Sequence, residues 1–198
     1  MRWPRRPAPS PYPAPVGVPT GLTRYELEVL QRYAAEAGTV LEVGTFYGYS
    51  AIGMALAGAT VLTIDPHNEG PANEPDTWPA FNAHVDRHRP LPAGIWPVRA
   101  YVEEWAQAHT GRLYGMAFID GDHSEAATLR AGLLAAARLR EPYTLAFHDY
   151  APNWPGVVAA VGVLEARLGL LLLRVEGCLR VYRLGVVNDA GGGPVEHV

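Results

Sequence analysis

The sequence has little cysteine, little charge and no long hydrophobic run, and each shortage excludes a class of protein. A single cysteine, Cys178, excludes an internal disulfide framework and a zinc site built from cysteines. Charged residues make up 18% of the 198 residues and the net charge is -4, so the basic face of a nucleic-acid binder is not expected.

No apolar run reaches the roughly 18 residues that a membrane span needs. The basic start is not followed by the apolar core of a signal peptide. We therefore expect a cytoplasmic protein that binds neither nucleic acid nor a membrane.

Hydrophobic residues make up 48% of the chain, which is enough for one sizeable core. Prolines recur at nearly every second position from Pro7 to Pro15, so residues 1–20 are expected to form an extended arm of the polyproline II type. Residues 188–198 contain three consecutive glycines before Pro194 and are expected to form a frayed tail. The domain itself is expected to span residues 21–187.

Helix-like and strand-like segments alternate between these ends. Helices are expected over 24–37, 49–57, 78–89, 102–108, 124–139 and 157–168, and strands over 39–43, 60–64, 95–99, 115–119, 143–147, 170–175 and 179–184. This order predicts an α/β fold of the doubly wound, Rossmann-like type, with a mostly parallel seven-stranded sheet and helices on both faces. The last two strands, joined around Glu176 and Gly177, predict an antiparallel hairpin at the edge of the sheet.

The turn after the first strand predicts a cofactor site. Residues 42–50 read E-V-G-T-F-Y-G-Y-S, and in open α/β sheets ligands bind beyond the carboxyl ends of the strands. Gly44 and Gly48 permit a close backbone approach or a positive φ. Two acidic residues lie nearby, because Glu42 precedes the first glycine and Asp65 ends the second strand. They would repel a pyrophosphate and favour a ligand with an amino group and ribose hydroxyls, as in S-adenosylmethionine.

Four motifs occur in order along the chain: E-V-G-T-F-Y-G-Y-S, T-I-D-P-H, F-I-D-G-D-H-S and F-H-D-Y. Together they resemble the class I S-adenosylmethionine-dependent methyltransferases, and most of all the small O-methyltransferase-like branch that includes cephalosporin-hydroxylase-type and macrocin-type enzymes. The resemblance covers about residues 40–150. It implies that S-adenosylmethionine is the cofactor and that its methionine part lies against Glu42, Gly44, Thr45 and Gly48.

The resemblance also implies roles for residues around that loop. Ser50 would support the loop, and Asp65 would accept hydrogen bonds from the ribose hydroxyls. The adenine would lie near Tyr101, after the third strand. Asp120, at the end of the fourth strand, would lie beside the cofactor and its methyl group.

A second group of polar residues follows the fourth and fifth strands. Asp120 and His123 belong to the first of these strand ends, and His148 and Asp149 to the second. Neighbouring parallel strands place their carboxyl ends side by side, so we expect these four side chains to meet. A simpler structural role is also open, because Asp122 or Ser124 can cap the following helix.

Three chemical roles are open for this group. The first is a site for Mg²⁺, Mn²⁺ or Zn²⁺ formed by Asp120, His148 and Asp149. The resemblance implies the two aspartates, whereas His148 stands where an acidic residue is usual. The second is general-base catalysis by His123 or His148, oriented by Asp120 or Asp149. The third is substrate binding by hydrogen bonds alone.

The leading hypothesis is an S-adenosylmethionine-dependent methyltransferase that acts on a hydroxyl of a small molecule or sugar. A nicotinamide-dependent oxidoreductase is one alternative, although the loop lacks the G-x-G-x-x-G spacing. A non-catalytic Rossmann-like binding module is another, although the polar residues at the strand ends are all present. Specificity is expected from the arm and from residues 66–97, and Trp154 is placed to wall a substrate pocket. A homodimer could complete that pocket.

Overall fold

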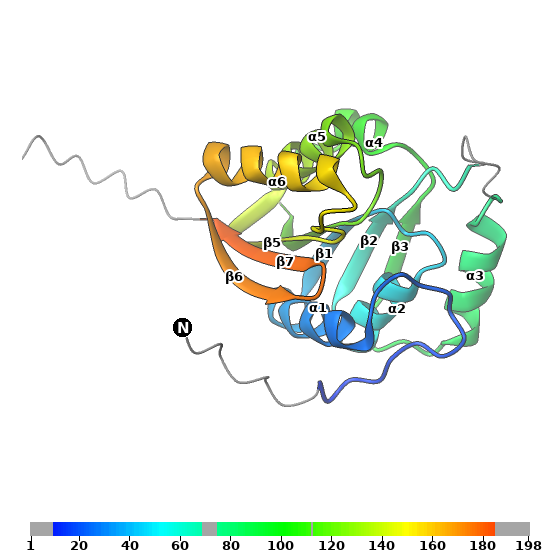
Figure 1. Ribbon diagram of the computed structural model, residues 1–198. Helices are drawn as coiled ribbons and strands as arrows, with labels where there is room; N and C mark the ends of the chain where they lie inside the picture. Colours follow the sequence, from blue (N-terminus) through cyan, green and yellow to red (C-terminus); the bar gives the residue numbers. More distant parts are fainter. Residues whose placement is uncertain (1–9, 69–74, 112, 185–198) are drawn as a thin grey trace, which may run out of the picture.

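The computed structural model describes residues 10–68, 75–111 and 113–184. Residues 1–9 of the expected arm and the whole expected tail, 188–198, lie outside the described residues. One seven-stranded sheet runs through the described part (Figure 1), in the order β3-β2-β1-β4-β5-β7-β6. Its strands are β1 (Thr39–Val43), β2 (Thr60–Ile64), β3 (Ile95–Val98), β4 (Tyr114–Ile119), β5 (Leu139–Phe147), β6 (Leu170–Glu176) and β7 (Leu179–Leu184).

The pairing confirms the predicted sheet. Strands β1 to β5 pair in parallel, with β1 between β2 and β4. Strand β7 pairs antiparallel with both β5 and β6, so the closing hairpin forms the expected antiparallel edge. The carboxyl ends of β1, β2, β4 and β5 therefore lie along one edge of the sheet, which we call the carboxyl edge.

Helices cover both faces of the sheet (Figure 1). They are α1 (Arg24–Ala37), α2 (Tyr49–Leu56), α3 (Trp78–Arg87), α4 (Val102–Ala108), α5 (Glu125–Ala136) and α6 (Pro155–Leu168). Residues of α1 and α2 share a buried cluster with one face of the sheet, and α3 packs beside α2. Residues of α4, α5 and α6 share a cluster with the other face. No helix among the described residues is long and apolar enough to cross a membrane.

The strand sequences explain this two-sided core. Successive side chains of a strand point to opposite faces, so Met116 and Phe118 pack toward α1 and α2 while Ala117 and Ile119 pack toward α4 to α6. All of them are buried, which is why β4 reads as a continuous apolar run.

Several predicted boundaries are wrong, and two of the differences have a clear physical cause. The helix expected over 124–139 ends at Ala136, and Leu139 begins β5 instead. Leu139 is fully buried and pairs with Tyr114, so its packing in the sheet outweighs the helix-forming sequence around it. The turn of the hairpin lies one residue later than expected, at Gly177 and Cys178, because Glu176 still pairs with Leu179.

The described part of the arm packs on the domain. The Ser10 hydroxyl donates to Gln31 of α1, and the amide of Val16 donates to the ring of His88 just after α3. Val18 is buried with Phe81 and Val85 of α3. Residues 10–20 thus cross the outside of the helices that cover this face of the sheet.

Candidate active site

Gly44 joins the tips of β1 and β4. It has a φ of 94°, and a Cβ at this position would lie closer to the carbonyl oxygen of Asp120 than real Cβ atoms come to any atom. The amide of Gly44 donates to Ile64 at the end of β2, at 2.9 Å, and the amide of Asp120 donates to Val43 at 2.8 Å. The glycine therefore lets the cofactor loop and the end of β4 touch through their backbones.

Asp65 shapes the same loop. Its Oδ2 accepts hydrogen bonds from the amides of Thr45 and Phe46, at 2.7 and 2.9 Å, and its Oδ1 accepts from the amide of His67 at 2.7 Å. A carboxylate has about four acceptor sites, so roughly one site remains free. The expected contact of Asp65 with a ribose stays a prediction, whereas its role in fixing the loop was not anticipated.

Glu42 lies buried beneath the loop. The Thr63 hydroxyl donates to Glu42 Oε2 at 2.5 Å, and Thr63 is in turn hydrogen-bonded to the Thr45 hydroxyl. Burial raises the pKa of Glu42 to about 8, although the neighbouring hydroxyls of Ser50 and Thr63 oppose the shift. Its other oxygen, Oε1, is buried without a hydrogen-bond partner among the described residues. An unsatisfied acceptor therefore lies under the loop.

Tyr101 follows β3 and precedes the first residue of α4, and half of it is exposed. Its hydroxyl accepts a hydrogen bond of 2.9 Å from Asn68 Nδ2, which follows the Asp65 turn. Arg99 joins the same region to α3, because it donates to the carbonyl of His67 and to Asp76. The ends of β2 and β3 are therefore tied together beside the loop.

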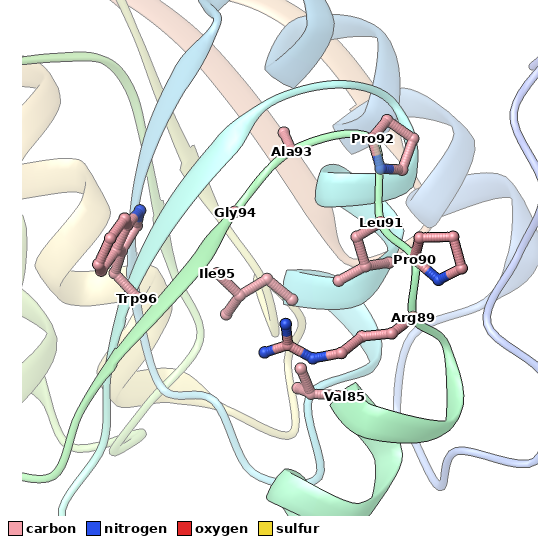
Figure 2. A pocket seen from close by; sticks show the side chains of 9 residues that line it. All are labelled: Val85, Arg89, Pro90, Leu91, Pro92, Ala93, Gly94, Ile95 and Trp96. Atoms are coloured by element: carbon pink, nitrogen blue, oxygen red, sulfur yellow. The ribbon is translucent and has the colours of Figure 1, made fainter.

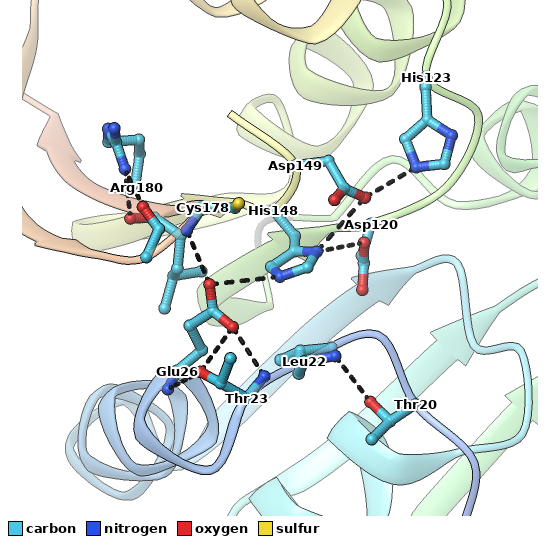
Figure 3. Close-up of polar contacts among 12 residues, drawn as sticks. Thr20, Leu22, Thr23, Glu26, Asp120, His123, His148, Asp149, Cys178 and Arg180 are labelled. Carbon is cyan, nitrogen blue, oxygen red and sulfur yellow. Dashed lines mark hydrogen bonds and ion pairs between the residues drawn. The ribbon is translucent and has the colours of Figure 1, made fainter. Parts of the chain in front are cut away.

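The four residues expected at the ends of β4 and β5 do meet (Figure 3). His123 Nε2 and Asp149 Oδ2 are hydrogen-bonded at 2.8 Å. His148 Nδ1 lies 3.3 Å from Asp120 Oδ1 and 3.4 Å from Asp149 Oδ2. Asp149 has a φ of 55°, which is unusual for a residue other than glycine. This backbone turn directs the Asp149 carboxylate back toward both histidines.

A fifth residue, Glu26 of α1, belongs to this group and was missed from the sequence. Glu26 is 2% exposed, and its Oε1 lies 3.6 Å from His148 Nε2. The same oxygen accepts a hydrogen bond of 2.8 Å from the amide of Cys178 in the hairpin turn. The only sequence signal was local: Thr23 and Glu26 have the spacing of a capping box, which α1 does form.

The charges of the group act strongly on one another. Burial alone would lower the pKa of His148, but the carboxylates of Asp120, Asp149 and Glu26 outweigh burial and raise it to about 12. Burial likewise opposes the shift at Glu26, yet the nearby ring of His148 and the hydrogen bonds from Thr23 lower its pKa to about 2. The pKa of Asp120 is raised, chiefly by burial. The three carboxylates therefore favour a positive charge at the position of the His148 ring.

His123 occupies the exposed end of the group. The hydrogen bond with Asp149 raises the pKa of His123. Its ring stacks on Trp154, with 3.9 Å between ring centroids, and both side chains are partly exposed. Gly156 at the start of α6 makes this contact possible, because a Cβ there would lie 2.5 Å from the carbonyl oxygen of His123.

Two sets of residues could hold a metal ion. Ligand atoms of Asp120, His123 and Asp149 lie within 4.8 Å of one another. The set expected from the sequence has His148 in place of His123, and its ring nitrogen also faces both aspartates. The two sets share both carboxylates and differ in the histidine, one of which is exposed and the other buried.

A cavity of 740 Å³ lies elsewhere on the molecule (Figure 2). Val85 of α3 and residues 89–96, which lead into β3, line it. These residues precede or begin β3, so the cavity lies at the opposite end of the strands from the carboxyl edge. None of the site residues described above lines it, and we assign it no part in the chemistry.

The sequence matches one family model. Residues 41–150 match a family described as a methyltransferase domain, which is more than half of the chain. No curated protein is similar enough in sequence to count as a match.

Solved structures with similar folds include several methyltransferases. An O-methyltransferase from Bacillus cereus in complex with SAH is 15% identical, with 84% of each chain covered and a TM-score of 0.62. The O-methyltransferase TomG from Streptomyces achromogenes, in complex with SAM, is 16% identical, with 83% of this chain and 81% of that chain covered and a TM-score of 0.59. A TDP-rhamnose 3'-O-methyltransferase of calicheamicin biosynthesis is 18% identical, with 80% and 77% covered and a TM-score of 0.58. At these identities the likeness shows a shared fold.

Proposed function

Because this chain belongs to the methyltransferase-domain family, we propose that it transfers the methyl group of S-adenosylmethionine to a hydroxyl of a small molecule or sugar. The family is the one expected from the sequence motifs. The observation that carries the O-methylation proposal is the pair of His123 and Asp149 at the exposed end of the carboxyl edge, because methyl transfer to a hydroxyl requires that its proton be removed.

The loop between β1 and α2 supplies the proposed cofactor site. The buried, unpartnered oxygen of Glu42 is suited to the amino group of S-adenosylmethionine, and Asp65 retains an acceptor site for a ribose hydroxyl. Gly44, Thr45 and Gly48 would form the loop around the methionine part, with Ser50 holding Glu42 below it. Tyr101 offers an exposed ring for the adenine.

Asp120 and the histidine pair would lie at the reacting end. Asp149 accepts from His123 Nε2, so in the neutral ring Nδ1 keeps the lone pair that can take the substrate's proton. Trp154 holds the ring from one face and offers a wall for the substrate. His148 is buried between three carboxylates, so we assign the base role to His123 alone.

The buried ring of His148, with Nδ1 facing Asp120 and Asp149, fits a divalent cation such as Mg²⁺, Mn²⁺ or Zn²⁺ held by these three residues. Such a cation would lower the pKa of a bound hydroxyl and so assist removal of its proton. His123 would remain outside this set and act on the substrate.

Calorimetric titration with S-adenosylmethionine and S-adenosylhomocysteine tests the cofactor. We expect one site per chain for each compound, and no binding of either at high micromolar concentration would refute the proposal. Transfer of a labelled methyl group to a panel of hydroxylated small molecules then tests the reaction. Asp149→Ala is the control, since it should bind the cofactor and lose turnover.

We propose a cytoplasmic location and a small-molecule substrate, with no nucleic-acid partner. We also propose a homodimer, because the edge strand β6 exposes Leu171, Leu172 and Leu173, and an unpaired apolar edge is suited to another copy of the chain. Light scattering in solution would contradict the dimer if it gave the mass of one chain at all concentrations.

A further inference from the structure

The ring of His148 is buried, with a carboxylate near each of its two nitrogens. The residue is 6% exposed, and its Nε2 has no hydrogen-bond partner among the described residues. A buried polar group without a partner is costly. An explanation must therefore account for both nitrogens of this ring.

The first nitrogen, Nδ1, faces two carboxylates at nearly equal distance. It lies 3.3 Å from Asp120 Oδ1 and 3.4 Å from Asp149 Oδ2. Ligand atoms placed about 2.1 Å from an ion in neighbouring octahedral positions lie about 3 Å from one another. Both distances from Nδ1 are therefore close to the spacing of metal ligands.

The second nitrogen, Nε2, faces Glu26. The two oxygens of this carboxylate have separate partners: Oε2 accepts from the amide and hydroxyl of Thr23, and Oε1 accepts from the amide of Cys178 and faces His148 at 3.6 Å. Oε2 is thus occupied by the capping of α1, and the hydrogen bond from the hairpin turn holds Oε1 facing His148 (Figure 3).

A histidine that binds a metal through one nitrogen usually donates the hydrogen of the other to a carboxylate, which fixes the ring and makes it a better ligand. We propose that Glu26 is the residue that orients His148 in this way, so that the site takes Mn²⁺ or Zn²⁺ in preference to Mg²⁺. The preference follows from the nitrogen ligand, since imidazole suits transition metals and Mg²⁺ prefers oxygen. This inference rests on the metal-assisted form of the proposed function.

Metal titration of the full chain tests the proposal without any need for turnover. Chelator-treated protein is titrated with MnCl₂, ZnCl₂ and MgCl₂ by calorimetry at constant pH. We expect one site for Mn²⁺ and Zn²⁺ and weaker binding of Mg²⁺. Glu26→Gln should weaken Mn²⁺ binding by about 10–100-fold, the usual effect of losing such an outer partner. Glu26→Asp should recover part of the loss.

Two control variants separate this role from the capping of α1. Thr23→Ala removes the capping partner and leaves the Glu26 oxygen that faces His148, so its Mn²⁺ affinity should equal that of the wild type. Glu28→Gln removes a carboxylate of the same helix that pairs with Arg24 and not with His148, and it too should bind as the wild type does. Thermal unfolding monitored by circular dichroism confirms that each variant is folded before it is titrated.

Spectroscopy identifies the ligand. Electron spin echo modulation of bound Mn²⁺ should show a directly bound imidazole nitrogen that is lost in His148→Asp. If the nitrogen signal persists in that variant, His123 is the ligand and Glu26 has no path to the metal.

The proposal is also overturned if none of the three ions binds the wild type, since His148 is then an imidazolium without a metal. It is equally overturned if Mg²⁺ binds more tightly than Mn²⁺, or if Glu26→Gln binds Mn²⁺ as tightly as Thr23→Ala. Cofactor titration with S-adenosylhomocysteine is a separate measurement, so failure of the proposed function would be seen there and not in the metal titrations.

Discussion

Gly44 differs in its surroundings from Gly58, another glycine with a positive φ. Gly58 has a φ of 88° and nothing within 4 Å of an added Cβ, whereas Gly44 has a φ of 94° and the backbone of Asp120 and Gly121 in the way. Gly58 is needed only for its conformation. Gly44 is needed also because the backbone at the end of β4 occupies the space that a side chain would fill.

Substitution by alanine should separate these two needs. Gly58→Ala should cost about 1–2 kcal/mol of unfolding free energy, the usual penalty for a left-handed residue with a Cβ. Gly44→Ala should cost roughly 1–3 kcal/mol more, because the backbone of Asp120 cannot yield without disturbing the sheet. Urea unfolding measures both, and equal losses would contradict the close contact.

His123 predicts the pH dependence of methyl transfer. A base must be neutral to accept a proton, and the hydrogen bond with Asp149 raises the pKa of His123. The rate should therefore rise with pH through a midpoint above 6.5, the ordinary value for histidine. Asp149→Asn should move this midpoint to lower pH and also reduce the plateau.

The companion variant His123→Gln should lower kcat by about 10²–10⁴-fold, the usual contribution of a general base. Binding of S-adenosylhomocysteine should not change. A pH profile of His123→Gln that still follows the wild-type midpoint would show that another group is the base.

Some residues of the site could be predicted and others could not, for a physical reason. Asp120, His123, His148 and Asp149 follow neighbouring parallel strands, so the topology alone brings them to one edge. Glu26 carries no such signal, since it reaches His148 only because the start of α1 docks against the hairpin turn. The stack of Trp154 on His123 likewise depends on how closely α6 approaches.

At the scale of elements, α6 sets the position of His123, the proposed base. Gly156 lies in the first turn of α6 with its Cα against the carbonyl of His123, while Gly162 of the same helix is exposed and has open space around it. The two glycines therefore have different roles within one helix. They form a matched pair for substitution.

Gly156→Ala should push α6 away from the segment that carries His123, so kcat should fall while cofactor binding is kept. Gly162→Ala should leave kcat unchanged and raise stability by about 0.5–1 kcal/mol, since alanine favours a helix more than glycine does. Steady-state kinetics and thermal unfolding of both variants check this. Equal kcat values would mean that α6 does not position His123.

The elements themselves were largely predictable, because the apolar pattern changes period between strands and helices. The boundaries of α1, β1, β2, α4 and β7 coincide with the expectation. The misplaced boundary at Leu139 has an identifiable cause: leucine suits both structures, and only its pairing with Tyr114 decides between them. Local sequence holds no information about that partner.

At the scale of the whole molecule, the buried charges predict how the protein responds to acid. The pKa of Glu26 is lowered to about 2 from an ordinary value of 4.5. A depressed pKa contributes stability that is fully present above the unfolded value and is lost as pH falls through the folded one. The unfolding free energy should therefore fall as pH drops from about 4.5 toward 2, by roughly 3 kcal/mol for Glu26 alone.

Glu26→Gln should flatten this part of the stability curve, and Glu28→Gln should leave it as it is. Urea unfolding at a series of pH values measures the slopes. If the slopes of the Glu26→Gln variant and the wild type agree below pH 4.5, the pairing of Glu26 with His148 contributes nothing to acid stability.

The contact between Glu26 and Cys178 spans 152 positions of the chain. A ribosome therefore releases Glu26 long before the hairpin turn that aims its free oxygen exists. Until that turn is made, nothing orders His148 from its far side, even though all four strand-tip residues have already been synthesised. The geometry of the carboxyl edge is thus completed only after the closing hairpin has been synthesised, and a nascent chain that already contains every motif still lacks an assembled site.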